Sequence, residues 1–172
     1  MTDYQLRPIS PDGVPEALIM AHRYRLLNEP RAAESICRDV LVIDADNQQA
    51  LVTLLLALTD QFGMSASVSI QDVQTVVPQL TSEYEREYYQ GIIYERWAKS
   101  QLESQVPGYV VYELLCRAMT CYDRAAPISP DNNDDATLRY NTCVRMIQRY
   151  SALKPRPEEH SHVGNYGDSS PL

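Results

Sequence analysis

The sequence has little positive charge and no long apolar run. Its 15 Lys and Arg residues are outnumbered by 23 Asp and Glu residues, and the formal net charge is −8. Binding to nucleic acid generally needs a basic face that replaces phosphate counterions, so this balance argues against a nucleic-acid partner. The longest apolar stretch runs from Ala50 to Leu58 and contains Thr53. It is well short of the roughly 20 residues that span a bilayer, and we therefore expect no membrane insertion.

Cysteine is also sparse, and none of the four cysteines has the spacing of a metal site or a redox pair. They are Cys37, Cys116, Cys121 and Cys143, with no CxxC pattern and no neighbouring His. All four fall in helical patterns, where cysteine usually acts as a small buried hydrophobe. The N-terminal segment up to Pro15 lacks the basic region and apolar core of a secretory signal. Both observations favour a cytoplasmic protein with reduced thiols.

Motifs that mark enzymes and metal sites are missing. The sequence has no phosphate loop, GxSxG elbow or HExxH pair. His22, the only histidine in a predicted helix, has no identifiable nucleophile or carboxylate partner for acid–base work. The acidic segment 131–135 fails as a calcium loop, because Ala136 stands where the turn needs Gly and Thr142 where a bidentate Glu belongs. We predict that the chain is not an enzyme and has no catalytic residue, no metal site and no cofactor.

One spacing of residues occurs three times. Each set has four residues, and the last three follow the first by 4, 7 and 12 positions. The first residue is small, and the last lies near the predicted end of a helix. The sets are Ala33, Cys37, Val40 and Ala45; Ala66, Ile70, Val73 and Pro78; and Ala118, Tyr122, Ala125 and Pro130. Offsets of 4 and 7 place side chains on one stripe of an α-helix. A repeated unit must stack on a neighbour to bury such a stripe, so the spacing predicts an array of helical repeats.

Turn residues and apolar periodicity divide the chain into three parts. They are an N-terminal leader at residues 1–13, a helical repeat domain at 14–153 and a flexible C-terminal tail at 154–172. Helices are predicted at about residues 14–27, 31–43, 48–61, 65–77, 82–101 and 109–126, and a last helix follows residues 131–135. No segment shows the sustained alternation of a strand. The predicted fold class is all-α, with about seven or eight helices.

At these positions the sequence resembles the tetratricopeptide repeat (TPR), a 34-residue helix–turn–helix motif. The residues that carry the resemblance are Ala21, Tyr24, Ala33 and Cys37 in one repeat, and Gly91, Tyr94, Ala118, Tyr122, Ala125 and Pro130 in another. The resemblance implies a right-handed superhelical stack of helix–turn–helix units, with small residues where adjacent helices approach closely. It also implies a protein-binding scaffold, although family members share a fold and differ in their partners.

The resemblance further implies which residues would face a ligand, because fixed positions of each first helix line the concave surface. Carried over, these positions give a candidate peptide-binding groove of Arg25, Leu56, Tyr88, Ile92, Arg96, Asn141 and Arg145. The three arginines could hold peptide carboxylates through forked hydrogen bonds. Asn141, one turn before Arg145, could bond the peptide backbone. The open alternative is that the arginines are solvated or pair with Glu95 and Asp60.

Tyrosines offer a second candidate interface. Tyr84, Tyr88 and Tyr89 cannot all face one core, so we expect at least one on the surface as an anchor for a partner. Tyr94 and Tyr112 lie in apolar stripes, and we expect them to pack between helices.

The predicted function is protein–protein interaction. We expect an adaptor, scaffold or small chaperone that holds a segment of another protein or a peptide in the concave groove. One alternative is a structural subunit that self-assembles into a homo-oligomer through exposed repeat ends. Another is a secretion-system chaperone, a role in which small acidic repeat proteins occur.

Overall fold

The computed structural model describes residues 4–64 and 68–157, and within these ranges it contains seven α-helices and no strand. The helices are α1 (Val14–Leu26), α2 (Pro30–Ile43), α3 (Gln48–Thr59), α4 (Ile70–Gln74), α5 (Glu83–Glu103), α6 (Gly108–Ala125) and α7 (Asp135–Arg149). Short 3-10 helices cover Pro11–Gly13, Val77–Gln79 and Ala126–Ile128. The prediction of an all-α protein with about seven or eight helices is confirmed for the described part of the chain.

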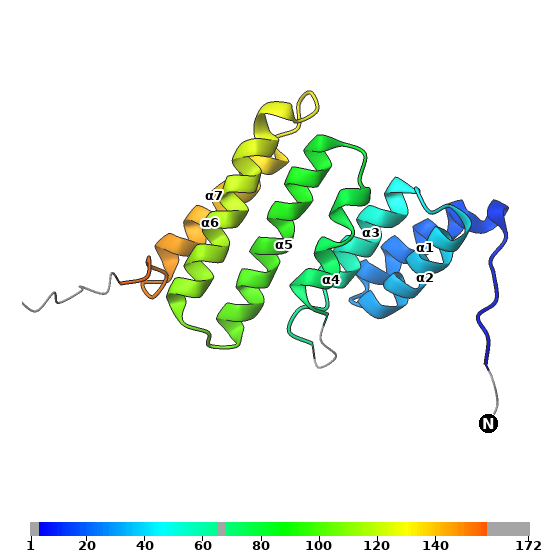
Figure 1. The fold of residues 1–172 in the computed structure, drawn as a ribbon, viewed down its shortest axis with the longest axis horizontal. Helices are drawn as coiled ribbons and strands as arrows, with labels where there is room; N and C mark the ends of the chain where they lie inside the picture. Colours follow the sequence, from blue (N-terminus) through cyan, green and yellow to red (C-terminus); the bar gives the residue numbers. More distant parts are fainter. Residues whose placement is uncertain (1–3, 65–67, 158–172) are drawn as a thin grey trace, which may run out of the picture.

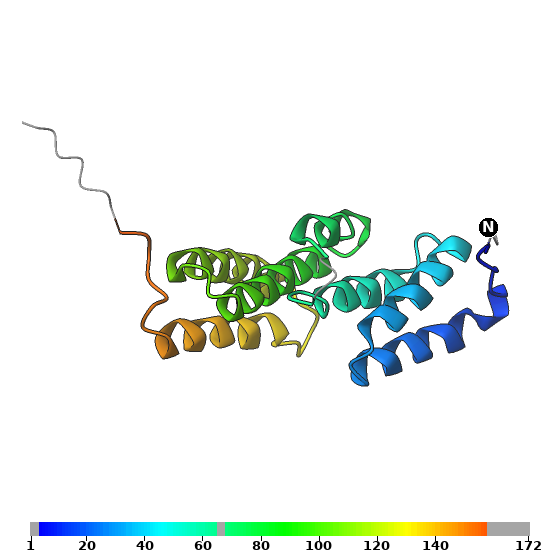
Figure 2. The same ribbon diagram turned by 90° about the horizontal axis from the view of Figure 1, so that it is seen from below.

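Consecutive helices pack side by side across an elongated molecule (Figure 1). α2 packs against both α1 and α3, and α6 packs against both α5 and α7. Contacts of α3 and α4 with α5 join the two groups. Figure 2 shows α1 and α7 on the same side of the molecule, below α2 and α6 as drawn. Contacts along the row therefore bury an apolar stripe of each long helix, such as Leu18 and Ala21 of α1.

The core consists of two main clusters that meet near the middle of the row. The first includes Leu51, Leu55 and Leu58 of α3, which is buried over most of its surface as its sequence predicts. The second lies between α5, α6 and α7 and includes Leu115 and Tyr122. The small residues expected at close helix contacts, Ala21, Ala33, Gly91 and Ala118, are all buried.

The helix expected at residues 65–77 is much shorter in the structure. Only Ile70–Gln74 is α-helical, and Ala66, from the repeated spacing, lies outside the described residues. The helix begins late because Ser69 and Asp72 form a capping box, in which each side chain accepts the backbone N–H of the other. It ends early because Pro78 has no N–H to donate to the Gln74 carbonyl. Residues 75–77 are also all β-branched, which lowers helix propensity.

The chain after α7 folds back onto the start of α6. Leu153 is buried in the second cluster, at 3 % exposed. A Cβ on Gly108 would lie 2.1 Å from the Ala152 carbonyl oxygen, so this close approach requires glycine. The Arg156 guanidinium stands 4.9 Å from the centre of the Tyr109 ring. Of the predicted tail at 154–172, residues 158–172 lie outside the described residues.

The Leu153 contact predicts that the segment after α7 contributes to stability. Leu153→Ala should lower the free energy of unfolding by about 2–3 kcal/mol, because it leaves a cavity in the second cluster. Lys154→Ala, at the exposed neighbouring position, should change it by less than about 0.5 kcal/mol. Urea denaturation of the two variants measures both values. Equal stability of the two would show that Leu153 is not packed in the core.

Candidate functional site

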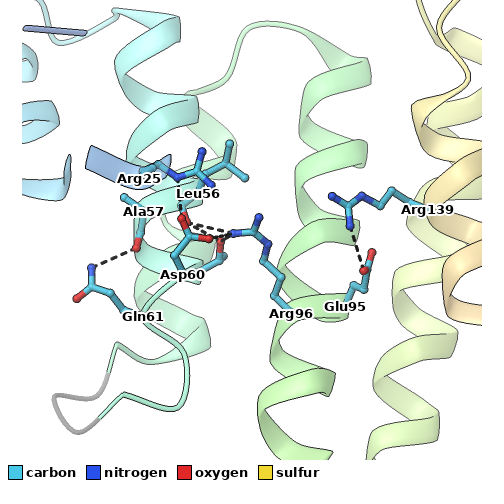
Figure 3. A network of polar contacts seen from close by, with 9 residues as sticks. Arg25, Leu56, Ala57, Asp60, Gln61, Glu95, Arg96 and Arg139 are labelled. Carbon is cyan, nitrogen blue, oxygen red and sulfur yellow. Dashed lines mark hydrogen bonds and ion pairs between the residues drawn. The ribbon is translucent and has the colours of Figure 1, made fainter. Parts of the chain in front are cut away.

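The middle of the molecule holds a network around Asp60, the residue that follows α3 (Figure 3). Nε of Arg25, on α1, donates a hydrogen bond to Asp60 Oδ2 at 2.7 Å. Arg96, on α5, forms an ion pair with Asp60 Oδ1 and donates to Thr59 Oγ1 at 2.7 Å. The same guanidinium reaches the Leu56 carbonyl oxygen at 3.3 Å. Two of the predicted groove arginines therefore converge on one carboxylate from opposite sides.

This network ties α1, α3 and α5 together, and it uses Nε of Arg25 and Nη1 of Arg96 as donors. Burial lowers the pKa of the Arg96 guanidinium, and the charge of Asp60 opposes that shift. The structure thus has one of the two arrangements that the sequence left open, since Arg25 and Arg96 pair with Asp60. The positive charge of both arginines is therefore already paired with the Asp60 carboxylate.

A second network surrounds Glu95, whose side chain is completely buried. Figure 3 shows its contact with Arg139. Its carboxylate accepts a hydrogen bond from the Tyr122 hydroxyl at 2.7 Å. Lys99 Nζ lies 2.5 Å and Arg139 Nη1 3.3 Å from Oε1 of the same carboxylate. Burial and the adjacent negative charge raise the pKa of Tyr122, so its hydroxyl stays protonated and donates. The network joins α5, α6 and α7, and it gives the buried Glu95 carboxylate the partners without which its burial would be costly.

Three apolar or aromatic residues of the predicted groove pack inside the molecule. Ile92 is 2 % exposed and belongs to the second core cluster. Leu56 is partly buried and packs against both clusters. The ring of Tyr88 is half-buried, stacked on Tyr84 with 5.6 Å between centres and 6.0 Å from the Tyr122 ring. These side chains connect helices, and Ile92 presents no surface to a ligand.

An open groove of about 1030 Å³ lies between the last turns of α5 and α7. Its lining residues are Lys99, Leu102, Glu103, Thr142, Arg145, Met146, Gln148, Arg149 and Tyr150. α6 packs against both flanking helices. Arg145 is the predicted site residue that lines this groove, whereas Asn141 lies one turn before it on α7 and is half-buried.

Positive charge dominates the groove. Lys99, Arg145 and Arg149 contribute to its lining, against the single carboxylate of Glu103, and of these three cations Lys99 is paired with Glu95. Within residues 4–64 and 68–157, neither Arg145 nor Arg149 forms an ion pair, and both side chains are exposed. They are four residues apart on α7 and so lie on one face of the helix. Their guanidinium groups are available for charge-assisted hydrogen bonds to carboxylates.

Several groove residues escaped the sequence-based prediction. The family positions carried over from the resemblance end at Arg96 on one helix and Arg145 on the other. The helices themselves continue to Glu103 and Arg149, and the groove lies along these extra turns. The signal available in the sequence was the pair Arg145 and Arg149, two cations at helical spacing near Met146 with no acidic residue three or four positions away.

The described residues include possible metal ligands and four cysteines. They contain no group of three or more His, Cys, Asp or Glu residues that could hold a metal ion. All four cysteines are free thiols. Burial raises the pKa of Cys37 to about 11 and that of Cys143 to about 12, and protonated thiols are poor nucleophiles. In this part of the chain, no helix combines the length and the apolar character needed to cross a membrane.

Comparisons with protein-family models, with curated proteins and with solved structures found no match to this chain. The similarity to the TPR family therefore consists of a resemblance at the repeat positions, such as Gly91, Tyr94 and Ala118. The site is defined by its own geometry, which is a cationic groove with an apolar component at one end of a row of helices.

Proposed function

We propose that the chain is a TPR-like interaction adaptor or small chaperone that binds a segment of another protein between α5 and α7. The observation that carries the proposal is the cationic groove, with Arg145 and Arg149 unpaired among the described residues of a chain whose net charge is −8. Two free guanidinium groups on one helix face are suited to carboxylates. In the TPR-like superhelix that the resemblance implies, α5 and α7 are first helices of successive units, and the groove belongs to the concave surface.

The lining defines the ligand as an acidic segment with at least one apolar side chain. Leu102, Met146 and Tyr150 form the apolar part of the groove, and methionine adapts its shape to different partners. The volume of about 1030 Å³ is at the upper end of the range for small-molecule sites, which favours a peptide segment over a metabolite. Glu103 disfavours a second carboxylate at the α5 rim, so the acidic side chain is assigned to the α7 side.

The proposal predicts which peptides the chain selects and which arginines they need. Selection from a displayed library of random peptides about 12 residues long should enrich acidic residues next to apolar ones, by the chemistry of groove recognition. Each of Arg145→Ala and Arg149→Ala should weaken the selected peptides about tenfold, since a charge-assisted hydrogen bond is worth roughly 1.5–3 kcal/mol. Raised salt should weaken binding as well. Fluorescence polarisation measures all three effects.

The matched control is a pair of exposed arginines outside the groove. Arg31→Ala on α2 and Arg117→Ala on α6 remove the same charge and should leave peptide affinity within about twofold, because they share no partner with the site. Enrichment of basic or uncharged peptides would refute the ligand assignment. Equal losses in the groove and control variants would show that affinity follows net charge and not the groove.

The secretion-system chaperone remains a narrower version of the same proposal, in which the bound segment belongs to an exported protein. A cytosolic location, expected from the sequence, fits both versions. Self-assembly through an exposed repeat end is favoured by a different observation, the outer face of α1.

A further inference from the structure

The outer face of α1 exposes several large apolar side chains. Ile19 is 60 % and Met20 45 % exposed, and so is Leu27, the residue that follows α1, at 61 %, whereas Leu18 and Ala21 bury the opposite face of the helix. α1 stands at one end of the row of helices (Figure 1). The end units of helical arrays normally carry a polar outer face for solubility. An exposed apolar face at this end of the array is typical of a surface that binds another protein.

These side chains form one continuous stripe with charged residues at defined places. Glu16, Ile19, Met20, Arg23, Tyr24 and Leu27 surround a depression of about 250 Å³. Positions 16, 20, 23 and 27 alternate steps of four and three residues, which is the spacing of a helix–helix seam. Glu16 and Arg23 form no ion pair with any residue in the described ranges. Two unpaired opposite charges thus flank an exposed apolar centre.

We propose that α1 pairs antiparallel with α1 of a second copy of this chain. With the two-fold axis between Ile19 and Met20, Glu16 of each copy faces Arg23 of the other. Ile19 of each copy then packs on Met20 of the other. Residues 16 and 23 are each about 5 Å from this axis along the helix, at 1.5 Å per residue, so one alignment satisfies both charge pairs. A two-fold interface requires such self-complementarity.

The positions of Glu16 and Arg23 along α1 favour antiparallel pairing of the two copies and disfavour parallel pairing. In a parallel pair, Glu16 would face Glu16 and Arg23 would face Arg23, and like charges across an interface are repulsive. The contact is one helix long, which places the dimer among small and reversible interfaces. α1 lies at the opposite end of the row from α7 (Figure 1), so pairing leaves the proposed peptide groove open in both copies.

Charge reversal tests the pairing with the full chain. Sedimentation equilibrium from roughly 1 to 500 μM should show a mass that rises from monomer to dimer, the range expected for a small interface. Glu16→Arg alone and Arg23→Glu alone should each weaken the dimer about tenfold, because they turn two attractive contacts into two repulsive ones. The double variant Glu16→Arg with Arg23→Glu should restore dimerisation. Ile19→Glu should abolish it by burying an uncompensated charge at the centre.

Val42→Glu is the matched control, because it changes an exposed apolar residue on α2 that the pairing does not use. It should leave the monomer–dimer equilibrium unchanged, and far-UV circular dichroism should show native helix content in every variant. A monomer at all concentrations would overturn the proposal. So would a dimer that is insensitive to Ile19→Glu, or a double charge reversal no better than the single ones, which would exclude the antiparallel alignment.

Discussion

Gly91→Leu is expected to lower the free energy of unfolding by about 3 kcal/mol or more, the upper part of the range for overpacked cores. A Cβ at position 91 would lie 2.5 Å from Cε1 and 2.8 Å from Cδ1 of the Tyr122 ring. The ring has no room to retreat, because Tyr122 is fully buried and its hydroxyl is bound to Glu95 Oε2 at 2.7 Å. Glycine is otherwise a poor residue inside a helix, so its presence in α5 is explained by this contact.

A double-mutant cycle separates the clash from other effects of the substitution. Gly91→Ala adds only the Cβ and should still destabilise, although alanine favours helix by about 1 kcal/mol over glycine. In a Tyr122→Ala background the same change should become neutral or stabilising, since the opposing ring is gone. Thr120→Leu, at an exposed position of α6, is the control and should change stability little. If Gly91→Ala costs as much with Ala at position 122 as with Tyr, the ring contact is not the cause.

The sequence predicts the regular part of the fold well because its signals are local. Pro30 and Pro107 stand beside the starts of α2 and α6, and the capping side chains of Asn47 and Ser82 precede α3 and α5. The prediction of one helix over residues 65–77 is wrong because the apolar residues of this segment pack in the core whether or not its backbone is helical. Val76 and Val77 are buried in non-α backbone, so burial there left a helix-like pattern without a long helix.

The site is less predictable because it depends on contacts between distant residues. Arg25 and Arg96 carry the same charge as Arg145, and their sequence neighbours do not distinguish them. What distinguishes them is Asp60, which the end of α3 places between α1 and α5. The repeat positions carried over from the TPR resemblance also predict which helices flank a groove, but they do not predict the length of those helices. The extra turns that carry Lys99 and Arg149 come from the length of α5 and α7 in this chain.

Lys99 and Arg139 are the two cations that contact the buried Glu95 carboxylate. Lys99→Met together with Arg139→Met should lower the free energy of unfolding by about 3–5 kcal/mol, the cost of leaving a buried charge without its partner. The carboxylate would retain only the Tyr122 hydroxyl at 2.7 Å, and Glu95 has no exposed surface through which water could reach it. Either single change should cost less, because the other cation remains, and thermal or urea denaturation measures all three values.

The substitution Glu95→Gln tests this directly. Its effect on the free energy of unfolding should have opposite signs in the native chain and in the Lys99→Met, Arg139→Met variant. In the native chain it removes the carboxylate that Lys99 and Arg139 contact, so it should destabilise by about 1–3 kcal/mol. In the Lys99→Met, Arg139→Met background it removes the uncompensated charge, while its amide oxygen can still accept from Tyr122, so it should stabilise. Glu85→Gln, on the same helix and only partly buried, controls for loss of a carboxylate and should not change sign. The same direction of effect for Glu95→Gln in both backgrounds would show that the two cations do not neutralise Glu95 in the folded protein.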